Sequence, residues 1–192
     1  MRSFYFMDEY IDIVDKFGNS TGKSALKSEA HKNGWYHNTI HLWLYTKGGD
    51  VLLQQRSHKK AIHPLLWDVS VAGHIDTGET IESAVIRETE EEIGLKLKAN
   101  DLRKIAVHFH ESTYFDGAIT DREFHHIYIA ELKVPLRDLV AQPSEVEALK
   151  LVHLSAFNEL IFNSSKNMHF IESNTDYYHF VGAEIFNELN PK

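Results

Sequence analysis

Residues 73–95 constrain the fold of this chain more than any other segment. Thr80 is a suitable helix N-cap, and Gly94 stands where a helix ends in the left-handed conformation. We therefore predict a helix from Ile81 to Ile93. At about 100° per residue, its apolar stripe consists of Ile81, Ala84 and Val85.

Two glutamates project from the middle of that stripe. Glu88 and Glu92 are four residues apart and share a helix face, with Glu91 on its flank. Because burying an unpaired carboxylate is costly, something positive must meet them. Arg87 is predicted to point elsewhere, toward Glu79. A hard divalent cation, Mg²⁺ or Mn²⁺, suits such closely spaced carboxylates. The alternative is an acidic helix face that is simply solvated.

Strand-like runs lie on both sides of this helix. Alternating or β-rich residues predict strands at 9–15, 39–46, 51–56, 67–72, 104–109, 124–132 and 149–154. The residues Lys47-Gly48-Gly49-Asp50 predict a hairpin between the second and third of them. Amphipathic stretches near 155–163 and 176–189 predict two further helices. The mixture indicates an α/β or α+β fold around a mixed sheet.

The length and composition predict one globular domain. The chain has 192 residues, of which 43% are hydrophobic, and we divide it into an N-terminal strand extension (1–38), a core (39–165) and a C-terminal helical segment (166–192). No apolar run approaches the ~20 residues of a membrane helix, and the N-terminus lacks the pattern of a signal peptide. We therefore expect a cytoplasmic protein with no membrane partner.

Charge and cysteine content exclude several kinds of site. The net charge of −8 argues against nucleic acid as a general partner. The chain contains no cysteine, which excludes disulfides, thiolate nucleophiles and cysteine metal ligands. Its 13 histidines leave imidazole ligands available.

The segment GHIDTGETIESAVIRETEEEIGL resembles the signature of the Nudix hydrolase superfamily, G-x5-E-x7-R-E-U-x-E-E-x-G-U, where U is apolar. The matching residues are Gly73, Glu79, Arg87, Glu88, Glu91, Glu92, Gly94 and Leu95. Thr89 departs from the usual aliphatic residue at a packing position. Eight fixed positions in one segment form a far more specific signal than a lone glycine motif.

This resemblance implies a fold, a cofactor and a reaction. The implied fold is an α/β/α sandwich in which the signature forms a loop–helix–loop. Glu88, Glu91 and Glu92, with the carbonyl of Gly73, would bind Mg²⁺ or Mn²⁺, while Glu79 and Arg87 would fix the loop. The implied reaction is attack of water on a diphosphate, with a glutamate accepting the proton.

A wider stretch, from residue 9 to about 132, is similar to the isopentenyl-diphosphate isomerase branch of the superfamily. The similarity lies in DKFGNSTG (15–22), Lys27 with His31, His37, and QRSHKKAIHPLLWDVSVAGH (55–74). It implies a metal site of His31, His37, His74 and Asp121 or Glu123, with Glu92 at a second cation near the diphosphate. It also implies a diphosphate clamp of Lys27, Arg56 and Lys60.

Each of these residues also has an ordinary structural interpretation. His37 and His41 flank the start of a strand, where either suits a half-buried aromatic. Lys27, Arg56 and Lys60 suit surface charges, the usual role of a basic run. Asp121 and Glu123 lie on one strand face, which is equally consistent with a solvated edge.

The chain departs from the isomerase branch at catalytic positions. Ala72 stands in SVAGH where the branch has a cysteine, and Glu111 replaces an aromatic residue. No counterpart of the branch's Trp-bearing C-terminal segment is found in 157–180. A methyl group cannot carry a proton, so these losses remove the isomerisation machinery and leave metal and phosphate binding.

Three functions follow from this pattern. The leading hypothesis is metal-dependent hydrolysis of a small X-diphosphate, where X is a nucleoside, a sugar or an isoprenoid; a homodimer is the default assembly. Catalytic residues would come from Glu88, Glu91, Glu92 and Glu123. The first alternative is an isopentenyl-diphosphate isomerase that uses Glu111 and Glu123 as its acid–base pair. The second is a non-catalytic sensor that binds a nucleotide or metabolite.

Overall fold

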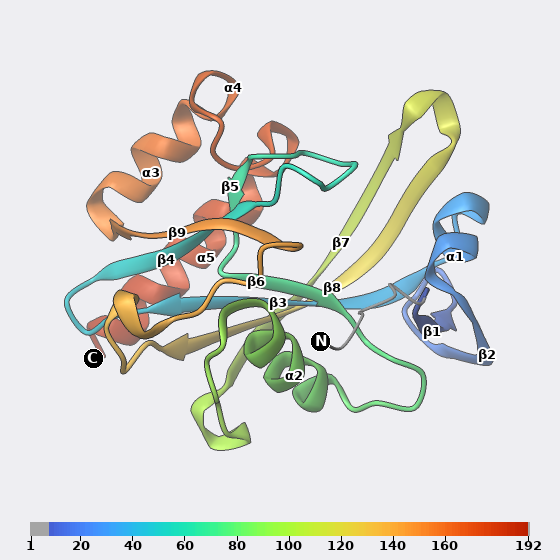
Figure 1. The fold of residues 1–192 in the computed structure, drawn as a ribbon, viewed down its shortest axis with the longest axis horizontal. Helices are drawn as coiled ribbons and strands as arrows, with labels where there is room; N and C mark the ends of the chain where they lie inside the picture. The colour runs from blue at the N-terminus through green and yellow to red at the C-terminus, as the bar shows by residue number, and fades with distance from the viewer. Residues whose placement is uncertain (1–7, 192) are drawn as a thin grey trace.

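A nine-stranded mixed sheet forms the centre of the computed structural model, which describes residues 8–191. The strands are β1 (Tyr10–Val14), β2 (Ser20–Leu26), β3 (His37–Tyr45), β4 (Asp50–Arg56), β5 (Trp67–Asp68), β6 (Val71–His74), β7 (Arg103–Tyr114), β8 (Ile119–Glu131) and β9 (Val146–His153). β3 runs through the middle of the sheet: it pairs with β8 in parallel and with β1, β4 and β6 antiparallel. The β7–β8 hairpin extends away from the sheet (Figure 1).

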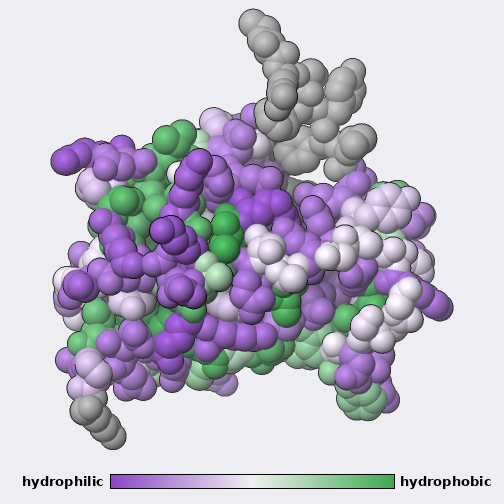
Figure 2. All heavy atoms as spheres, turned by 90° about the horizontal axis from the view of Figure 1, so that it is seen from below, coloured by the Kyte–Doolittle hydropathy of each residue, from purple (hydrophilic) through white to green (hydrophobic). Residues whose placement is uncertain are grey.

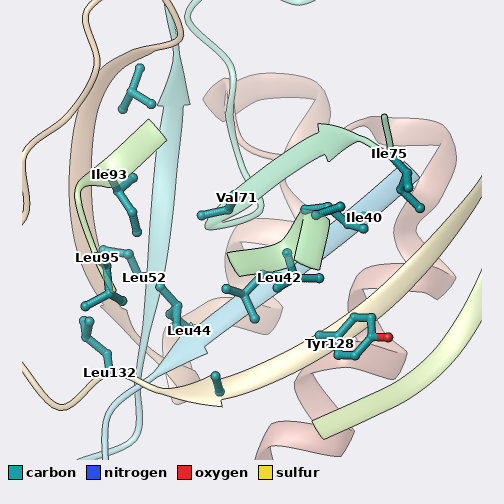
Figure 3. Packing of buried hydrophobic residues seen from close by; sticks show 14 residues of the cluster. Ile40, Leu42, Leu44, Leu52, Val71, Ile75, Ile93, Leu95, Tyr128 and Leu132 are labelled. Atoms are coloured by element: carbon teal, nitrogen blue, oxygen red, sulfur yellow. The ribbon is translucent and has the colours of Figure 1, made fainter. Parts of the chain in front are cut away.

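Helices cover both faces of this sheet. The helices are α1 (Lys27–Asn33), α2 (Ile81–Ile93), α3 (Leu154–Phe162), α4 (Ser164–Asn167) and α5 (Thr175–Leu189). One buried cluster joins α2 to alternate residues of β3, among them Ile40, Leu42 and Leu44 (Figure 3). The intervening residues, such as Trp43, join α3 and α5 in a second cluster. The α/β/α sandwich and the mixed sheet are therefore confirmed.

Local sequence explains the boundaries of α2. The hydroxyl of Thr80 accepts a hydrogen bond from the Ser83 amide at 3.2 Å, and Gly94 has a φ of 69° at the C-terminus. The predicted bounds of this helix are confirmed. Helices α3 and α5 begin and end within one residue of the predicted ranges.

Several strands differ from their predicted ranges. The predicted strand 67–72 is two short strands, β5 and β6, because Val69 and Ser70 leave the ladder between them. The hairpin of β7 and β8 is longer than predicted, since its tip pairs polar residues, Ser112 with Asp121 and Thr113 with Thr120. Strand β2 and helix α1 were not predicted at all, because STGKSAL and KSEAHKN lack a clear apolar period.

The predicted extension 1–38 contains β1, β2 and α1, while its residues 1–7, like Lys192, lie outside the described residues. Among residues 8–191, no helix is both long and apolar enough to cross a bilayer. The face seen from below is mostly hydrophilic, in keeping with the net charge of −8 (Figure 2).

Candidate active site

Four neighbouring strands build a polar floor on the α5 side of the sheet. Thr39 in β3 lies opposite His74 in β6 and His125 in β8, and His125 lies opposite His108 in β7. Two residues away along β3, β8 and β7, a second row consists of His37, Glu123 and His110. Because side chains alternate along a strand, the residues of both rows share one face.

Four side chains converge at one end of this floor. His31 from α1 meets His37, His74 and Glu123, and one nitrogen or oxygen of each lies within 4.8 Å of all the others. The Glu123 carboxylate is 3.4 Å from His37 Nε2 and 3.7 Å from both His31 Nε2 and His74 Nε2. We call these four residues the histidine cluster. Asp121 lies beside it, with a carboxylate oxygen 3.8 Å from His31 Nε2.

The pKa values of two residues in the histidine cluster are strongly shifted. Burial would raise the pKa of Glu123, but the nearby imidazoles of His31 and His37 outweigh it and hold that pKa well below its usual range. Burial and the charge of Lys27 hold the pKa of His74 well below the ordinary value for histidine. At neutral pH the cluster therefore offers an ionised carboxylate and the neutral imidazole of His74.

The glutamates of α2 lie on the opposite side of β6. Glu88 and Glu92 are 9% and 5% exposed, so both carboxylates are buried as predicted. Burial raises the pKa of Glu88 to about 7, although Arg87 acts in the other direction. Burial and the charge of Glu88 raise the pKa of Glu92 well above its usual value, and Gln54 donates a hydrogen bond to its carboxylate at 3.2 Å.

The signature glycine makes room for one of these glutamates. A Cβ atom built on Gly73 would lie 2.1 Å from Cδ of Glu88, far inside van der Waals contact. Glycine at this position therefore lets the Glu88 side chain pass directly over β6. The neighbouring residue His74 points to the other face, so a single short strand separates the two groups of candidate ligands.

The predicted orientation of Arg87 is partly wrong. Its guanidinium donates to Glu79 at 2.9 Å, as expected, but also to Glu88 at 2.9 Å and to Glu91 at 3.1 Å. The side chain is long enough to reach the adjacent carboxylate and the one a turn further on. Arg87 therefore offsets part of the charge of Glu88, whereas within residues 8–191 it forms no ion pair with Glu92.

The predicted basic clamp is spread over the site. Lys27 pairs with Glu9 at 3.0 Å, Lys60 pairs with Glu145, and Arg56 donates to the Ile62 carbonyl at 3.0 Å. The charge of Lys27 lowers the pKa of His74, and the charge of Lys60 lowers that of Glu92. Glu9, the partner of Lys27, raises the pKa of Glu88.

The proposed acid–base pair for isomerisation does not form. Glu111 lies opposite Arg122 and pairs with it at 2.8 Å, whereas Glu123 lies opposite His110. Since adjacent residues alternate in direction, Glu111 and Glu123 point to opposite faces. The expectation that they act together is therefore wrong. Ala72 does lie on the polar floor, directly opposite His41.

Most of the imidazoles of the polar floor were not predicted from the sequence. His108, His110 and His125 belong to it, and His41 stacks on His125 with ring centroids 4.0 Å apart. The alternation HFH at 108–110 with His125 two residues after Glu123 was the available signal. A cavity of about 430 Å³ elsewhere in the structure is lined by His63, Leu66, Phe170, Ile171, Glu172 and Ser173.

Comparison with known proteins gives the family. Residues 35–172 match the NUDIX domain. Nudix hydrolase 3 of Arabidopsis thaliana is 35% identical over 157 residues, which cover 80% of this chain but only 20% of that protein. Isopentenyl-diphosphate Delta-isomerase 2 of Photorhabdus laumondii is 31% identical over 159 residues, covering 82% of this chain and 85% of that protein.

Solved structures agree in fold. A crystal structure from Deinococcus radiodurans superposes with a TM-score of 0.65 at 16% identity, covering 90% of this chain and 98% of the other. With the intact glutamate signature on α2 and the matched domain around it, the chain belongs to the Nudix hydrolase family, in a branch similar to isopentenyl-diphosphate isomerases.

Proposed function

We propose that this protein hydrolyses a diphosphate linkage in a small X-diphosphate, with Mg²⁺ or Mn²⁺ as cofactor. The observation that carries the proposal is a pair of buried carboxylates, Glu88 and Glu92, beside a strand whose other face presents the histidine cluster. Two groups of ligands so close together suit a substrate with two adjacent phosphates.

The residues fit a bound cation. Among residues 8–191, the buried polar side-chain atoms without a hydrogen-bond partner are His74 Nε2 and Asp121 Oδ1, and both lie in or beside the histidine cluster. Imidazole with carboxylate suits Mn²⁺ better than Mg²⁺, whereas the carboxylates of Glu88, Glu91 and Glu92 suit either ion. The Gly73 carbonyl remains a predicted ligand at the same strand.

A bound divalent cation would supply charge neutralisation at the phosphate oxygens and a water of lowered pKa. The protein residues then have separate tasks. Lys27, Arg56 and Lys60 would exchange their present partners for phosphate oxygens. Burial raises the pKa of Glu88 to about 7 in the metal-free site, and a bound cation would lower it and hold the carboxylate ionised as a ligand. Glu123 is a weak base for this step, since its pKa lies well below the usual value.

The test is phosphate release from nucleoside, sugar and isoprenoid diphosphates, each with Mg²⁺ or Mn²⁺. We expect turnover of at least one class, and a loss of at least about 100-fold in Glu92→Gln. Glu90→Gln is the matched control, because Glu90 lies on the exposed side of the same helix and pairs with Lys96. Unchanged turnover in Glu92→Gln, or no turnover of any compound, would overturn the proposal.

Isomerisation is the second candidate, since the Photorhabdus relative is an isopentenyl-diphosphate Delta-isomerase. Ala72 and the outward position of Glu111 argue against it. Deuterium uptake from heavy water into carbon-bound positions of isopentenyl diphosphate would favour isomerisation. The cytoplasmic location, the homodimer and the small-molecule partner remain predictions.

A further inference from the structure

A buried hydrogen-bond chain connects α5 to the polar floor. Trp43 Nε1 donates to the Tyr177 hydroxyl at 2.8 Å, and that hydroxyl lies 2.7 Å from Nδ1 of His41. Trp43 is fully buried and Tyr177 is 4% exposed, so water does not compete for these contacts. The last member of this series of hydrogen bonds, His41 in β3, lies directly opposite Ala72.

These two hydrogen bonds determine which ring nitrogen of His41 carries the proton. An indole N–H is only a donor, so the Tyr177 oxygen accepts from Trp43. The Tyr177 hydroxyl proton then has one partner among the described residues, Nδ1 of His41. If Nδ1 carried a proton instead, the buried hydroxyl proton would be unpaired, at a cost that reduces its population on the order of 10-fold or more. His41 is therefore neutral and carries its proton on Nε2.

The Nε2–H of His41 is available to a ligand. No described residue forms a hydrogen bond with it. Among the described residues, the fully buried polar side-chain atoms without a partner are His74 Nε2 and Asp121 Oδ1, so Nε2 of His41 is not fully buried. Only the methyl group of Ala72 stands opposite His41 in β6. This donor sits on a partly exposed side chain, on the side of the sheet that carries the histidine cluster.

The position of His41 separates it from the diphosphate. It is four residues from His37 along β3, about 13 Å between Cα atoms. The ring of His125 lies between, stacked on His41 at 4.0 Å and with Nδ1 3.5 Å from a Glu123 oxygen. A diphosphate held at the histidine cluster would thus leave His41 facing the X group.

We propose that His41 is a substrate-binding residue whose Nε2–H donates to an oxygen of X, so that X bears a hydroxyl or carbonyl oxygen and is not a plain hydrocarbon. The inference rests on the proposed diphosphate substrate. A hydrocarbon X would bury the Nε2–H of His41 without a hydrogen-bond acceptor. We therefore expect kcat/KM for a hydrocarbon X to be lower by on the order of 10- to 100-fold.

The first test reads the tautomer by ¹⁵N NMR of histidine-labelled protein with Mg²⁺, using His41→Asn to assign the signals. Methylene-bridged analogues of dimethylallyl diphosphate and of its terminally hydroxylated counterpart are then added. We expect a neutral ring protonated on Nε2, and a larger Nε2–H shift with the hydroxylated analogue. A ring protonated on Nδ1, or the same response to both analogues, overturns the inference.

The second test compares kcat/KM for the two diphosphates in three variants. Asn at position 41 keeps an acceptor for Tyr177 and removes the Nε2 donor, whereas Gln restores an N–H near the Nε2 position. We expect His41→Asn to lose the preference for the hydroxylated compound, and His41→Gln to keep most of it. His126→Asn, on the opposite sheet face, should keep it fully.

The outcomes separate this inference from the proposed function. No phosphate release from any compound, together with the expected NMR response, refutes hydrolysis and leaves the role of His41 standing. Turnover of both diphosphates with equal kcat/KM in the wild type, or an unchanged preference in His41→Asn, refutes the role of His41 and leaves hydrolysis standing.

Discussion

Glu88→Gln should change how stability depends on pH. Burial raises the pKa of Glu88 to about 7 from 4.5, so the folded protein binds more protons than the unfolded chain between these values. Stability therefore falls as pH rises through this window, and above pH 7 the whole penalty is present. At about 1.4 kcal/mol per pKa unit, the penalty reaches about 3 kcal/mol. A neutral glutamine removes it.

The assay is chemical unfolding in EDTA at pH 5 and pH 8 for wild type, Glu88→Gln and the control Glu90→Gln. Between these pH values, the free energy of unfolding of wild type relative to Glu88→Gln should fall by about 2 to 3 kcal/mol. Saturating Mg²⁺ at pH 8 should stabilise wild type more than Glu88→Gln, because the variant lacks one carboxylate ligand. A difference independent of pH would refute the claim that this carboxylate is buried without an adequate partner.

Three further predictions concern the same site. Gly73→Ala should abolish turnover and cost about 1–3 kcal/mol in unfolding experiments, because its Cβ would overlap Glu88; Glu88→Ala in the same chain should recover most of that stability. Glu123→Gln should weaken Mn²⁺ binding by at least about 100-fold in calorimetry, while an unchanged affinity would remove the histidine cluster as a metal site. Thr80→Ala should cost about 1 kcal/mol through loss of the N-cap, and Thr80→Ser should cost much less.

The bounds of α2 and the burial of its two glutamates follow from the sequence for a physical reason. Helix caps, the apolar period and the paired glutamates are all local, so Thr80, Gly94, Glu88 and Glu92 can be interpreted without the rest of the chain. The fold class follows from the same kind of local pattern around it. The orientation of Arg87 was less predictable, because a long side chain with several nearby carboxylates has more than one solution.

The floor of the site depends on register, which no single segment reveals. His125 and His108 become neighbours only because β7 and β8 pair over their whole length. Likewise, the parallel pairing of β3 with β8 brings His37 to Glu123. The same register turns Glu111 away from the site, which is why its predicted partnership failed. Family resemblance supplied His31, His37 and His74, whereas the pattern of residues alone left each of them open.

The most direct measurement is anomalous diffraction at the manganese edge from crystals grown with Mn²⁺ and a methylene-bridged diphosphate. We expect one Mn²⁺ bound by His31, His37, His74 and Glu123, and a second at Glu88 and Glu92 across β6, with the diphosphate reaching both. Glu88 and Glu92 without metal, with the diphosphate bound elsewhere on the surface, would contradict it.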